Sequence, residues 1–518
     1  MRSDNVNGAP PKAGRKEWLG LAVLALPVLL ISITVTVLYF AVPFLSVDLR
    51  PSGAQLLWIV DIYAFLLAGL LIAMGSLGDR IGRRKLLLWG ATAFGLTSAA
   101  AAYAPTPELL IAARALQGAA AATLMPPTLA LIRNMFHDAA QRRLAVAVWA
   151  ASFAGGSVLG PIVGGWLLER LWWGAVFLIN VPIMVLLLVL GPLLLPEYRD
   201  PQPGRFDLWS AVLSLAAVLP VVYGVKQVAG GGAVLEVAGA VVVGLAFGLA
   251  FVRRQRTLAD PMLDLRLFRD RSFGVSLLTD TLAIFALVGV FYFVSQYLQM
   301  VLGLRPFVAG LLTLPAAVMA LVGALSAAAL VKWFRPGLTI AAGMLVACAG
   351  FVVLAQVGPG SHQAILVLGL ALLGAGIGVV QALASDLVVA VAPPERAGSA
   401  SAVLEAATEL GGALGVAVLG SMGLAVYRSV FEAPQGLSPD VARVAGETLG
   451  GAAGVAGDLP DALAAAVLES AREAFTTGMR VSALVAAVIL GLAAVLTALT
   501  LRRLSLDMTH AGDRTAGP

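Results

Sequence analysis

Apolar and polar positions alternate along this chain on the length scale of a lipid bilayer. Most apolar runs reach about 20 residues, which as a helix crosses a hydrocarbon core of roughly 30 Å. The polar segments between them are short, with one exception after residue 427. The pattern predicts fourteen membrane-spanning helices, at residues 18–42, 55–75, 86–104, 108–132, 144–168, 173–195, 207–226, 233–252, 273–297, 307–331, 337–357, 363–391, 398–427 and 479–501.

Composition agrees with an all-α integral membrane protein. Of the 518 residues, 60% are hydrophobic and 12% are charged, whereas a soluble domain carries about 25% charged residues. The net charge of +5 comes from bases in the short segments between spans, so we expect no nucleic-acid partner. The single cysteine, Cys348, excludes an intrachain disulfide.

The spans fall into two sets of six separated by two further spans. Residues 18–196 and 272–502 would each form a six-helix bundle, which is typical of transporters built from parallel repeats. Residues 197–271 would hold the two extra central helices, interpreted as a linker or lipid-facing pair rather than a substrate path. A cytoplasmic segment with a surface helix ending near Arg271 would follow them.

Basic residues predict the orientation in the membrane. Most of the 34 lysines and arginines lie in segments on the same side as the N-terminus, which places residues 1–17 and 503–518 in the cytoplasm. Residues 428–478 are then external. Leu437–Asp440 and Asp458–Asp461 each resemble a helix start, with a capping residue before a proline. We expect an external helical hairpin whose first helix breaks at Gly450-Gly451 and whose second spans Ala462 to Phe475.

A charged, glycine-rich segment, Gly75–Lys85, separates the second and third predicted spans. Its glycines let two helix ends approach, and Asp79 can accept a hydrogen bond from an arginine or cap the third helix. We expect a gating latch that joins helix ends across the cytoplasmic face, although the charge also fits a purely topogenic role. The residues assigned to this gating loop are Gly75, Asp79, Arg80, Gly82, Arg83 and Arg84.

Ionisable residues inside apolar spans are costly and usually mark an ion or substrate path. Glu405 and Glu409 lie four residues apart near the middle of span 13, on one helix face. Both cannot be ionised cheaply in a low-dielectric medium, so we expect one to hold a proton near neutral pH and to exchange it for a cation. A structural, hydrogen-bonded pair is the alternative. Asp61, Arg114 and Asp280 are further candidates, whereas Asp386 lies near the inner end of its span, where solvation suffices to explain it.

Small and aromatic residues add two further groups of candidates. Gly156, Gly160 and Gly164-Gly165 share one face of span 5 and permit close helix contact, and Pro161 adds a kink. Aromatic rings near a central cavity would stack on a flat or quaternary cation, although packing explains any single ring equally well. The residues assigned to the substrate cavity are Thr34, Tyr39, Trp58, Tyr63, Trp149, Asn180, Tyr292 and Gln296.

Several of these motifs resemble those of the major facilitator superfamily. Gly75–Lys85 resembles the family's loop between helices 2 and 3, and Leu109–Gly118 its fourth-helix motif, whose arginine is Arg114. Gly156–Gly165 resembles the fifth-helix motif of proton-coupled antiporters. The resemblance narrows to the fourteen-helix drug:proton antiporters because of Trp172–Pro182, Gln299–Gly303 and the fourteen spans. Within that group, the N-terminal half, including Trp58–Tyr63, is similar to QacA-like multidrug efflux transporters. The resemblance implies two bundles that rock about a central site, with Arg114 as a proton-relay or charge-balancing partner.

One position departs from that family. QacA-like relatives usually place an aspartate in helix 1, where this chain has Thr34. Threonine carries neither a proton nor a counter-charge at neutral pH. Coupling would then rest on Glu405 and Glu409 with fewer protons per cycle, or the substrate is less cationic, or coupling is poor.

The sequence therefore predicts a secondary transporter of the bacterial cytoplasmic (inner) membrane rather than an enzyme. It would export small lipophilic, cationic drugs, such as quaternary ammonium compounds or dyes, in exchange for protons. No phosphate-binding loop indicates ATP use and no ligand cluster indicates a metal, so we expect no cofactor beyond the proton gradient. We expect a monomer in the bilayer. A dedicated exporter of one amphiphile, such as an antibiotic or a lipid, and a non-transporting membrane scaffold or sensor remain alternatives.

Overall fold

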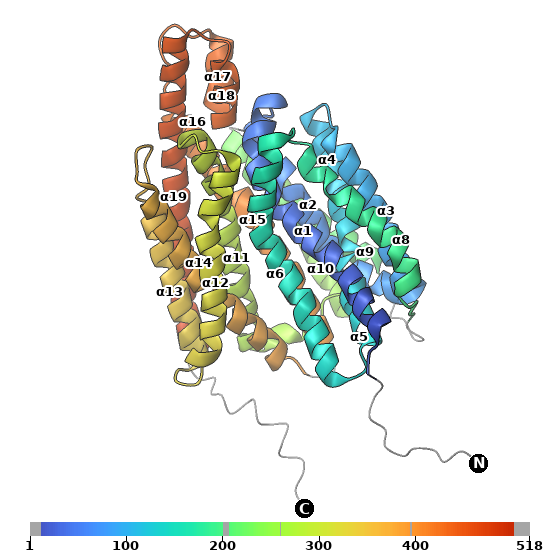
Figure 1. Cartoon of the computed structure of the whole chain (residues 1–518). Coiled ribbons are helices and arrows are strands. Elements are labelled where there is room, and N and C mark those ends of the chain that lie inside the picture. Colours follow the sequence, from blue (N-terminus) through green and yellow to red (C-terminus); the bar gives the residue numbers. More distant parts are fainter. Residues whose placement is uncertain (1–11, 200–206, 231, 259–260, 394–395, 502–518) are drawn as a thin grey trace, which may run out of the picture.

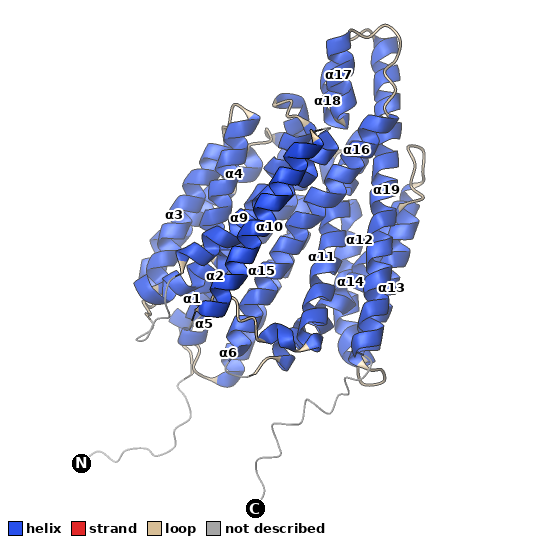
Figure 2. Ribbon diagram, turned by 180° about the vertical axis from the view of Figure 1, so that it is seen from behind, coloured by secondary structure: helices blue, strands red, loops and turns tan. Residues whose placement is uncertain are grey.

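The fold is a bundle of long helices joined by short turns (Figures 1 and 2). This computed structural model describes residues 12–199, 207–230, 232–258, 261–393 and 396–501, among which no strand occurs. The helices are α1 (Arg15–Asp48), α2 (Gly53–Ile81), α3 (Arg83–Ala102), α4 (Pro107–Ala122), α5 (Met125–Met135), α6 (Ala139–Arg170), α7 (Ala175–Leu178), α8 (Asn180–Leu194), α9 (Leu208–Gly230), α10 (Val234–Thr257), η1 (Leu267–Arg269), α11 (Arg271–Gln296), η2 (Tyr297–Val301), α12 (Pro306–Leu330), α13 (Pro336–Leu354), α14 (Gln363–Val391), α15 (Ala397–Gly415), η4 (Val416–Gly420), α16 (Ser421–Val430), α17 (Pro439–Glu447), α18 (Leu449–Ala456) and α19 (Asp461–Leu501).

Long apolar helices occupy the positions of the predicted spans. Among the described residues, 13 helical segments are long and apolar enough to cross a membrane. The third predicted span corresponds to α3, whose 20 residues begin with three bases and contain many small side chains, so it is less apolar than the others. It packs within the bundle against α4 and α8. The prediction of an all-α membrane fold is confirmed.

Three of the predicted spans are interrupted. Span 4 divides into α4 and α5 before Pro126-Pro127, because proline lacks the N–H that a continuous helix needs. Span 6 divides into the single turn α7 and the longer α8. Span 13 continues from α15 to α16 through the π-helical turn η4, a local irregularity that is frequent at functional sites.

The helices pack mainly within two groups, α1 to α8 and α11 to α19. We call them the N-terminal and C-terminal halves. The halves meet where α6 contacts α12, α2 contacts α15 and α1 contacts α11. The extra pair α9 and α10 lies at one flank: α10 is largely exposed, whereas α9 packs on α2 of one half and α16 of the other.

The predicted external hairpin is present, with two differences. Helices α17 and α18 and the start of α19 rise above one end of the bundle (Figure 1). The break in the first helix lies at Thr448, whose hydroxyl accepts a hydrogen bond from the Gly451 N–H, so the Gly450-Gly451 pair sits inside the first turn of α18. The second helix does not stop at Phe475 but continues as the last span, giving α19 41 residues. We call this end the hairpin face.

The opposite end is the loop face, where α2 meets α3, where α1 begins and where α19 ends (Figure 1). The prediction of a surface helix before Arg271 is wrong for the described residues of that segment. They form turns and only one short 3-10 helix, η1. Part of the segment, residues 259–260, lies outside the described residues, as do most of the two predicted cytoplasmic tails.

Candidate functional site

The two halves are joined at the hairpin face. The Ser295 hydroxyl on α11 donates to the Tyr39 carbonyl on α1 at 2.8 Å, and the Phe307 N–H donates to the Glu169 carboxylate at 3.2 Å. Gly165 on α6 lies so close to α12 that an added Cβ would be 2.6 Å from the Pro306 carbonyl oxygen. The Gln299 side-chain amide also donates to the Phe40 carbonyl at 3.3 Å, again toward this face.

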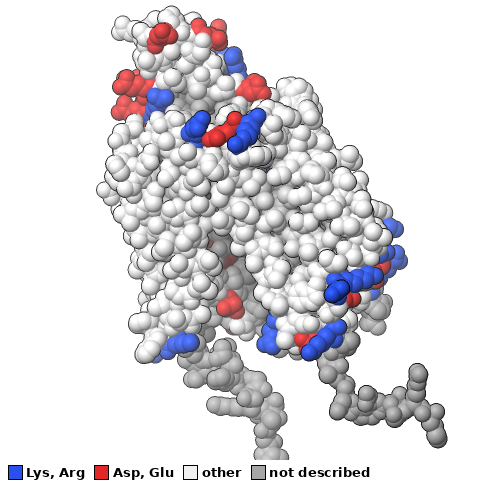
Figure 3. Space-filling view, in the orientation of Figure 1, with Lys and Arg blue, Asp and Glu red and all other residues white. Residues whose placement is uncertain are grey.

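Toward the loop face the halves separate. Figure 3 shows the molecular surface hollowed between them, with acidic side chains inside the hollow. The closed end and the hollow together define a central cleft that opens toward the loop face. This cleft is the candidate substrate path.

The C-terminal side of the cleft carries three carboxyl groups on two packed helices. Glu405 and Glu409 on α15 are half-buried, and neither makes a hydrogen bond or an ion pair with a described residue. Asp280 on α11 is only 1% exposed and accepts a hydrogen bond from the Thr408 hydroxyl at 2.9 Å, while its Oδ1 has no partner. Thr408 lies between the two glutamates in sequence, so the structure brings three of the four predicted carboxyl candidates into one region, without Asp61.

The N-terminal side carries a buried arginine in place of an acid cluster. The Arg114 guanidinium on α4 donates to the Ile59 carbonyl at 3.2 Å and to the Gln117 side chain at 2.7 Å, and it lies 4.4 Å from the centre of the Tyr63 ring. The close approach of α2 depends on Gly118, because an added Cβ would overlap the Tyr63 carbonyl. Arg114 makes no ion pair with any described residue.

Thr34 joins that arginine through a chain of neutral hydrogen bonds. The Thr34 hydroxyl donates to Asn180 on α8 at 3.0 Å, and the Asn180 amide donates to Ser98 on α3 at 3.2 Å. Ser98 also accepts from Gln117, which in turn binds Arg114. The position that lacks the expected aspartate is therefore fully buried and ordered by a polar network that crosses four helices.

Asp61 is paired with a residue that the sequence interpretation missed. The Lys226 ammonium on α9 lies 2.7 Å from Asp61 Oδ1 and 3.5 Å from the centre of the Trp58 ring. Both charged side chains are at most 1% exposed. The available signal was a lysine at the end of the otherwise apolar run 207–226, which from sequence alone is interpreted only as one of a linker or lipid-facing pair.

Most of the aromatic candidates form the closed end of the cleft rather than an open wall. Tyr39, Tyr63 and Tyr292 are buried, and Tyr39 packs edge-on against Phe291 across the two halves. Glu409 is near enough to Tyr39 and Tyr63 to interact with both electrostatically.

The two remaining cavity candidates bond to their own surroundings. Gln296 donates to the Tyr292 carbonyl of its own helix at 3.0 Å. Trp149 donates to Thr128 on α5 at 2.9 Å and lies away from this closed end. Asp386 is exposed, as its position near the helix end suggested.

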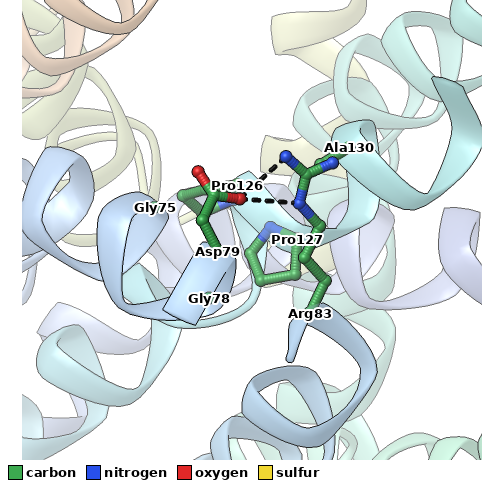
Figure 4. Close-up of a pocket in the computed structure, with 7 residues that line it drawn as sticks. All are labelled: Gly75, Gly78, Asp79, Arg83, Pro126, Pro127 and Ala130. Carbon is green, nitrogen blue, oxygen red and sulfur yellow. Dashed lines mark hydrogen bonds and ion pairs between the residues drawn. The ribbon is translucent and has the colours of Figure 1, made fainter. Parts of the chain in front are cut away.

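The Gly75–Lys85 segment is mostly helical. Helix α2 runs to Ile81, and the only residue between α2 and α3 is Gly82, which has a φ of 110° and would meet Glu197 if it carried a Cβ. Asp79 accepts from Arg83 at 2.8 Å and does not cap α3 (Figure 4). Gly75, Gly78, Asp79 and Arg83 line a cavity of about 130 Å³ against Pro126, Pro127 and Ala130.

The other partners of this segment also belong to the N-terminal half. Arg84 donates to the Leu195 carbonyl at 2.9 Å and lies near Glu197. Arg80 is exposed and makes no ion pair with a described residue. In this conformation the segment contacts helices of the N-terminal half only. A latch across the cytoplasmic face would also have to contact the C-terminal half.

The fifth-helix glycines face two different neighbours. An added Cβ at Gly156, Gly160 or Gly164 would meet α1, which belongs to the same half. Only Gly165 and the Pro161 carbonyl, which touches Gly310 on α12, reach the C-terminal half. The stripe therefore packs the N-terminal half internally and contributes one end to the contact between the halves.

Comparisons with known proteins agree with this architecture. The sequence profile of the Major Facilitator Superfamily matches residues 24–416. The multidrug efflux pump LfrA of Mycolicibacterium smegmatis is 48% identical over 500 residues, covering 96% of this chain and 99% of the pump. The methyl viologen resistance protein SmvA of Salmonella typhimurium is 36% identical over 466 residues, covering 89% and 93%.

Among solved structures, a bacterial homologue of the human lysosomal transporter Spinster has a TM-score of 0.66 at 18% identity, covering 97% of this chain and 99% of that chain. The chain is therefore a member of the Major Facilitator Superfamily, a multi-pass membrane transporter related to multidrug efflux pumps and not an enzyme.

Proposed function

We propose that this protein exports lipophilic cationic drugs across the bacterial cytoplasmic membrane in exchange for protons. The loop face is cytoplasmic, so the cleft receives drug from the cell interior and the inner leaflet. The transport unit is one chain, because both walls of the cleft come from the same polypeptide. The observation that carries the proposal is the group of three carboxyl side chains on the C-terminal wall.

Glu405 and Glu409 are suited to proton exchange because of what surrounds them. They are half-buried on one helix face, and no described cation neutralises them. Two adjacent carboxyl groups in a poorly solvated site favour sharing one proton over ionising together. A drug cation that enters the cleft would favour the ionised pair, and protonation would release the drug. Asp280, one helix away, adds a third acidic group to the same wall.

The relatives support the drug class. One related protein is named for multidrug efflux and another for resistance to methyl viologen, a flat molecule with two quaternary nitrogens. A wall with more than one carboxyl group matches a dication better than a neutral compound. Two tyrosines at the closed end of the cleft, Tyr39 and Tyr63, are also within electrostatic range of Glu409.

Purified protein in proteoliposomes with an imposed pH gradient tests the proposal. Wild-type protein should drive uptake or release of methyl viologen and of the monocation tetraphenylphosphonium when the gradient is applied. The variant Glu405→Gln/Glu409→Gln should lose gradient-driven transport of both. Glu473→Gln is the matched control, because that side chain is exposed on the outer part of α19.

Two outcomes would contradict the proposal. Gradient-driven transport that survives in the double glutamine variant would remove the glutamates from coupling. Wild-type transport of one uncharged amphiphile, with neither cation moved, would instead favour the dedicated exporter.

A further inference from the structure

Lys226 is the only described lysine held inside the bundle, and it comes from a helix outside both six-helix halves. Its ammonium contacts Asp61 Oδ1 at 2.7 Å on one side and the face of Trp58 at 3.5 Å on the other. Asp61 and Trp58 are less than one helical turn apart on α2, whereas Lys226 is 165 residues from Asp61 in sequence. The linker helix thus inserts a cation into a site that α2 supplies.

The geometry of this site is that of a cation receptor. A carboxylate and the face of an indole both bind an ammonium, the carboxylate by charge and the indole by its ring quadrupole. Asp61 Oδ2 is buried and has no hydrogen-bond partner in the described residues, so half of the carboxylate is unused. The buried Tyr39 and Tyr292 are near enough to Asp61 to interact with it electrostatically.

Stability alone explains the pair poorly. Two charges removed from water regain little net energy, and a buried ion pair is weak evidence for a structural role. Apolar contacts already fix α9 on α2: Phe65 and Val222 share a buried cluster with Ala413 and Ala417, and Gly69 admits Leu215 closely. Apolar side chains in place of both Asp61 and Lys226 would pack there without the cost of two buried charges.

The Lys226 ammonium can reach water when it leaves Asp61. It lies four residues before the end of α9, on the side of the hairpin face. A lysine side chain so close to a helix end can extend its long stem toward the interface and keep its ammonium in water. Release of the ammonium would leave Asp61 and Trp58 open to another cation.

We propose that Lys226 is a built-in ligand of the cation site formed by Asp61 and Trp58, and that a lipophilic monocation displaces its ammonium from Asp61. The site is thereby occupied in the absence of drug, and α9 responds to drug binding although it belongs to neither half. This inference rests on the proposed export of cations. Its test measures binding without any proton gradient, so it can fail while export and proton coupling stand.

The first test uses the wild-type protein in detergent. Reductive methylation followed by mass spectrometry reports how accessible each lysine is, and tetraphenylphosphonium, which has no amine, serves as the ligand. Lys226 should be methylated several-fold faster with the ligand bound, while the exposed Lys332 keeps its rate. An unchanged or lower rate at Lys226 under saturating ligand would overturn displacement.

The second test measures the dissociation constant of tetraphenylphosphonium by calorimetry. Lys226→Met removes the internal competitor and should tighten binding about tenfold, because a ligand no longer has to pay for opening an occupied site. Lys226→Arg keeps the competitor and Gln227→Met changes the neighbouring residue, so both should bind like the wild type. Unchanged or weaker binding by Lys226→Met would overturn the proposal.

A charge-neutral double variant separates this effect from folding. Asp61→Asn/Lys226→Met removes both charges and should melt near the wild-type temperature, but it should lack the tighter binding of Lys226→Met. If the double variant binds the cation as tightly as Lys226→Met, Asp61 is not the site of displacement and the proposal is wrong.

Discussion

The two walls of the central cleft carry opposite chemistry. In the N-terminal half, Arg114 is buried without an acidic partner and Asp61 is already neutralised by Lys226. In the C-terminal half, Asp280, Glu405 and Glu409 face no cation among the described residues. The charges of one wall are thus balanced or positive, and the acids of the other have no balancing cation among the described residues.

Under the proposed exchange of protons for drug, this difference gives the two halves different roles. A carboxyl group whose charge is already balanced changes little when a drug arrives, whereas an unbalanced one can trade a proton for a cation. The neutral network from Thr34 to Gln117 holds Arg114 in place and offers no group that titrates near neutral pH. The C-terminal wall is therefore where proton and drug would compete.

Asp61→Asn should have the largest effect on stability. It removes the counter-charge of the Lys226 ammonium, which must then stay buried unpaired or move out to water; an unpaired buried charge sets an upper limit of about 3–5 kcal/mol, whereas Glu405→Gln breaks no ion pair. We expect a clearly lower Tm for Asp61→Asn in detergent and a Tm near the wild-type value for Glu405→Gln. Equal melting of the two variants would show that the walls do not differ in how their charges are balanced.

Glu409→Gln should have the largest effect on transport that leaves the fold intact. We expect export of methyl viologen to fall about 30-fold, equivalent to about 2 kcal/mol, and export of tetraphenylphosphonium to fall less, because one carboxylate still suffices for a single charge. Initial rates in proteoliposomes give both values. The exposed Glu473→Gln variant should transport both cations at the wild-type rate. An equal loss of both cations in Glu409→Gln would show that the number of carboxylates on this wall does not set the preference for a dication.

Thr34→Asp should make the two walls more alike. The new carboxyl would lie beside Asn180 in the N-terminal half and supply the acid that the family resemblance leads us to expect in helix 1. We expect the ratio of dication to monocation export to rise about threefold, equivalent to about 0.7 kcal/mol, with more protons moved per drug. Thr34→Val is the control without charge. If a folded Thr34→Asp protein keeps the wild-type ratio, the charge of the N-terminal wall does not set selectivity.

Asp79→Asn should have the smallest effect on stability and a moderate one on transport. The Asp79–Arg83 pair is partly exposed and spans one helical turn, so its loss should cost about 0.5 kcal/mol. We expect transport to fall about fivefold with unchanged surface expression, because the segment would contact the C-terminal half only when the cleft closes at the loop face. Transport at the wild-type rate would leave the segment a brace within one half.

The fold could be predicted from the sequence because membrane spans are local. A run of apolar residues must become a helix in lipid, where each backbone polar group needs a partner within the segment. The same logic found Glu405, Glu409 and Asp280, since an acid in such a run is conspicuous on its own. The start of the first hairpin helix could be predicted for the same reason, because a helix cap is a local feature. The Ser438 side chain accepts the hydrogen bond from the Val441 N–H that caps the helix.

Partners across helices could not be predicted in this way. Lys226 stands at the end of an apolar run, where lysines commonly anchor at the membrane interface, and nothing nearby in sequence points to Asp61. Thr34 seemed electrically silent, yet it is the first link of a buried network that leads to Arg114. The fifth-helix glycines revealed a close contact but not that α1 would be the main neighbour.

The sequence by itself therefore determined the all-helical membrane fold, the approximate positions of most spans, the superfamily and which acidic residues lie within the spans. Tertiary structure alone decided which charges are balanced: it placed the Lys226 ammonium on Asp61 and left Glu405 and Glu409 without a cation. The physical reason is range. Hydropathy acts residue by residue along the chain, whereas the energy of a buried charge depends on what lies within a few ångströms of it.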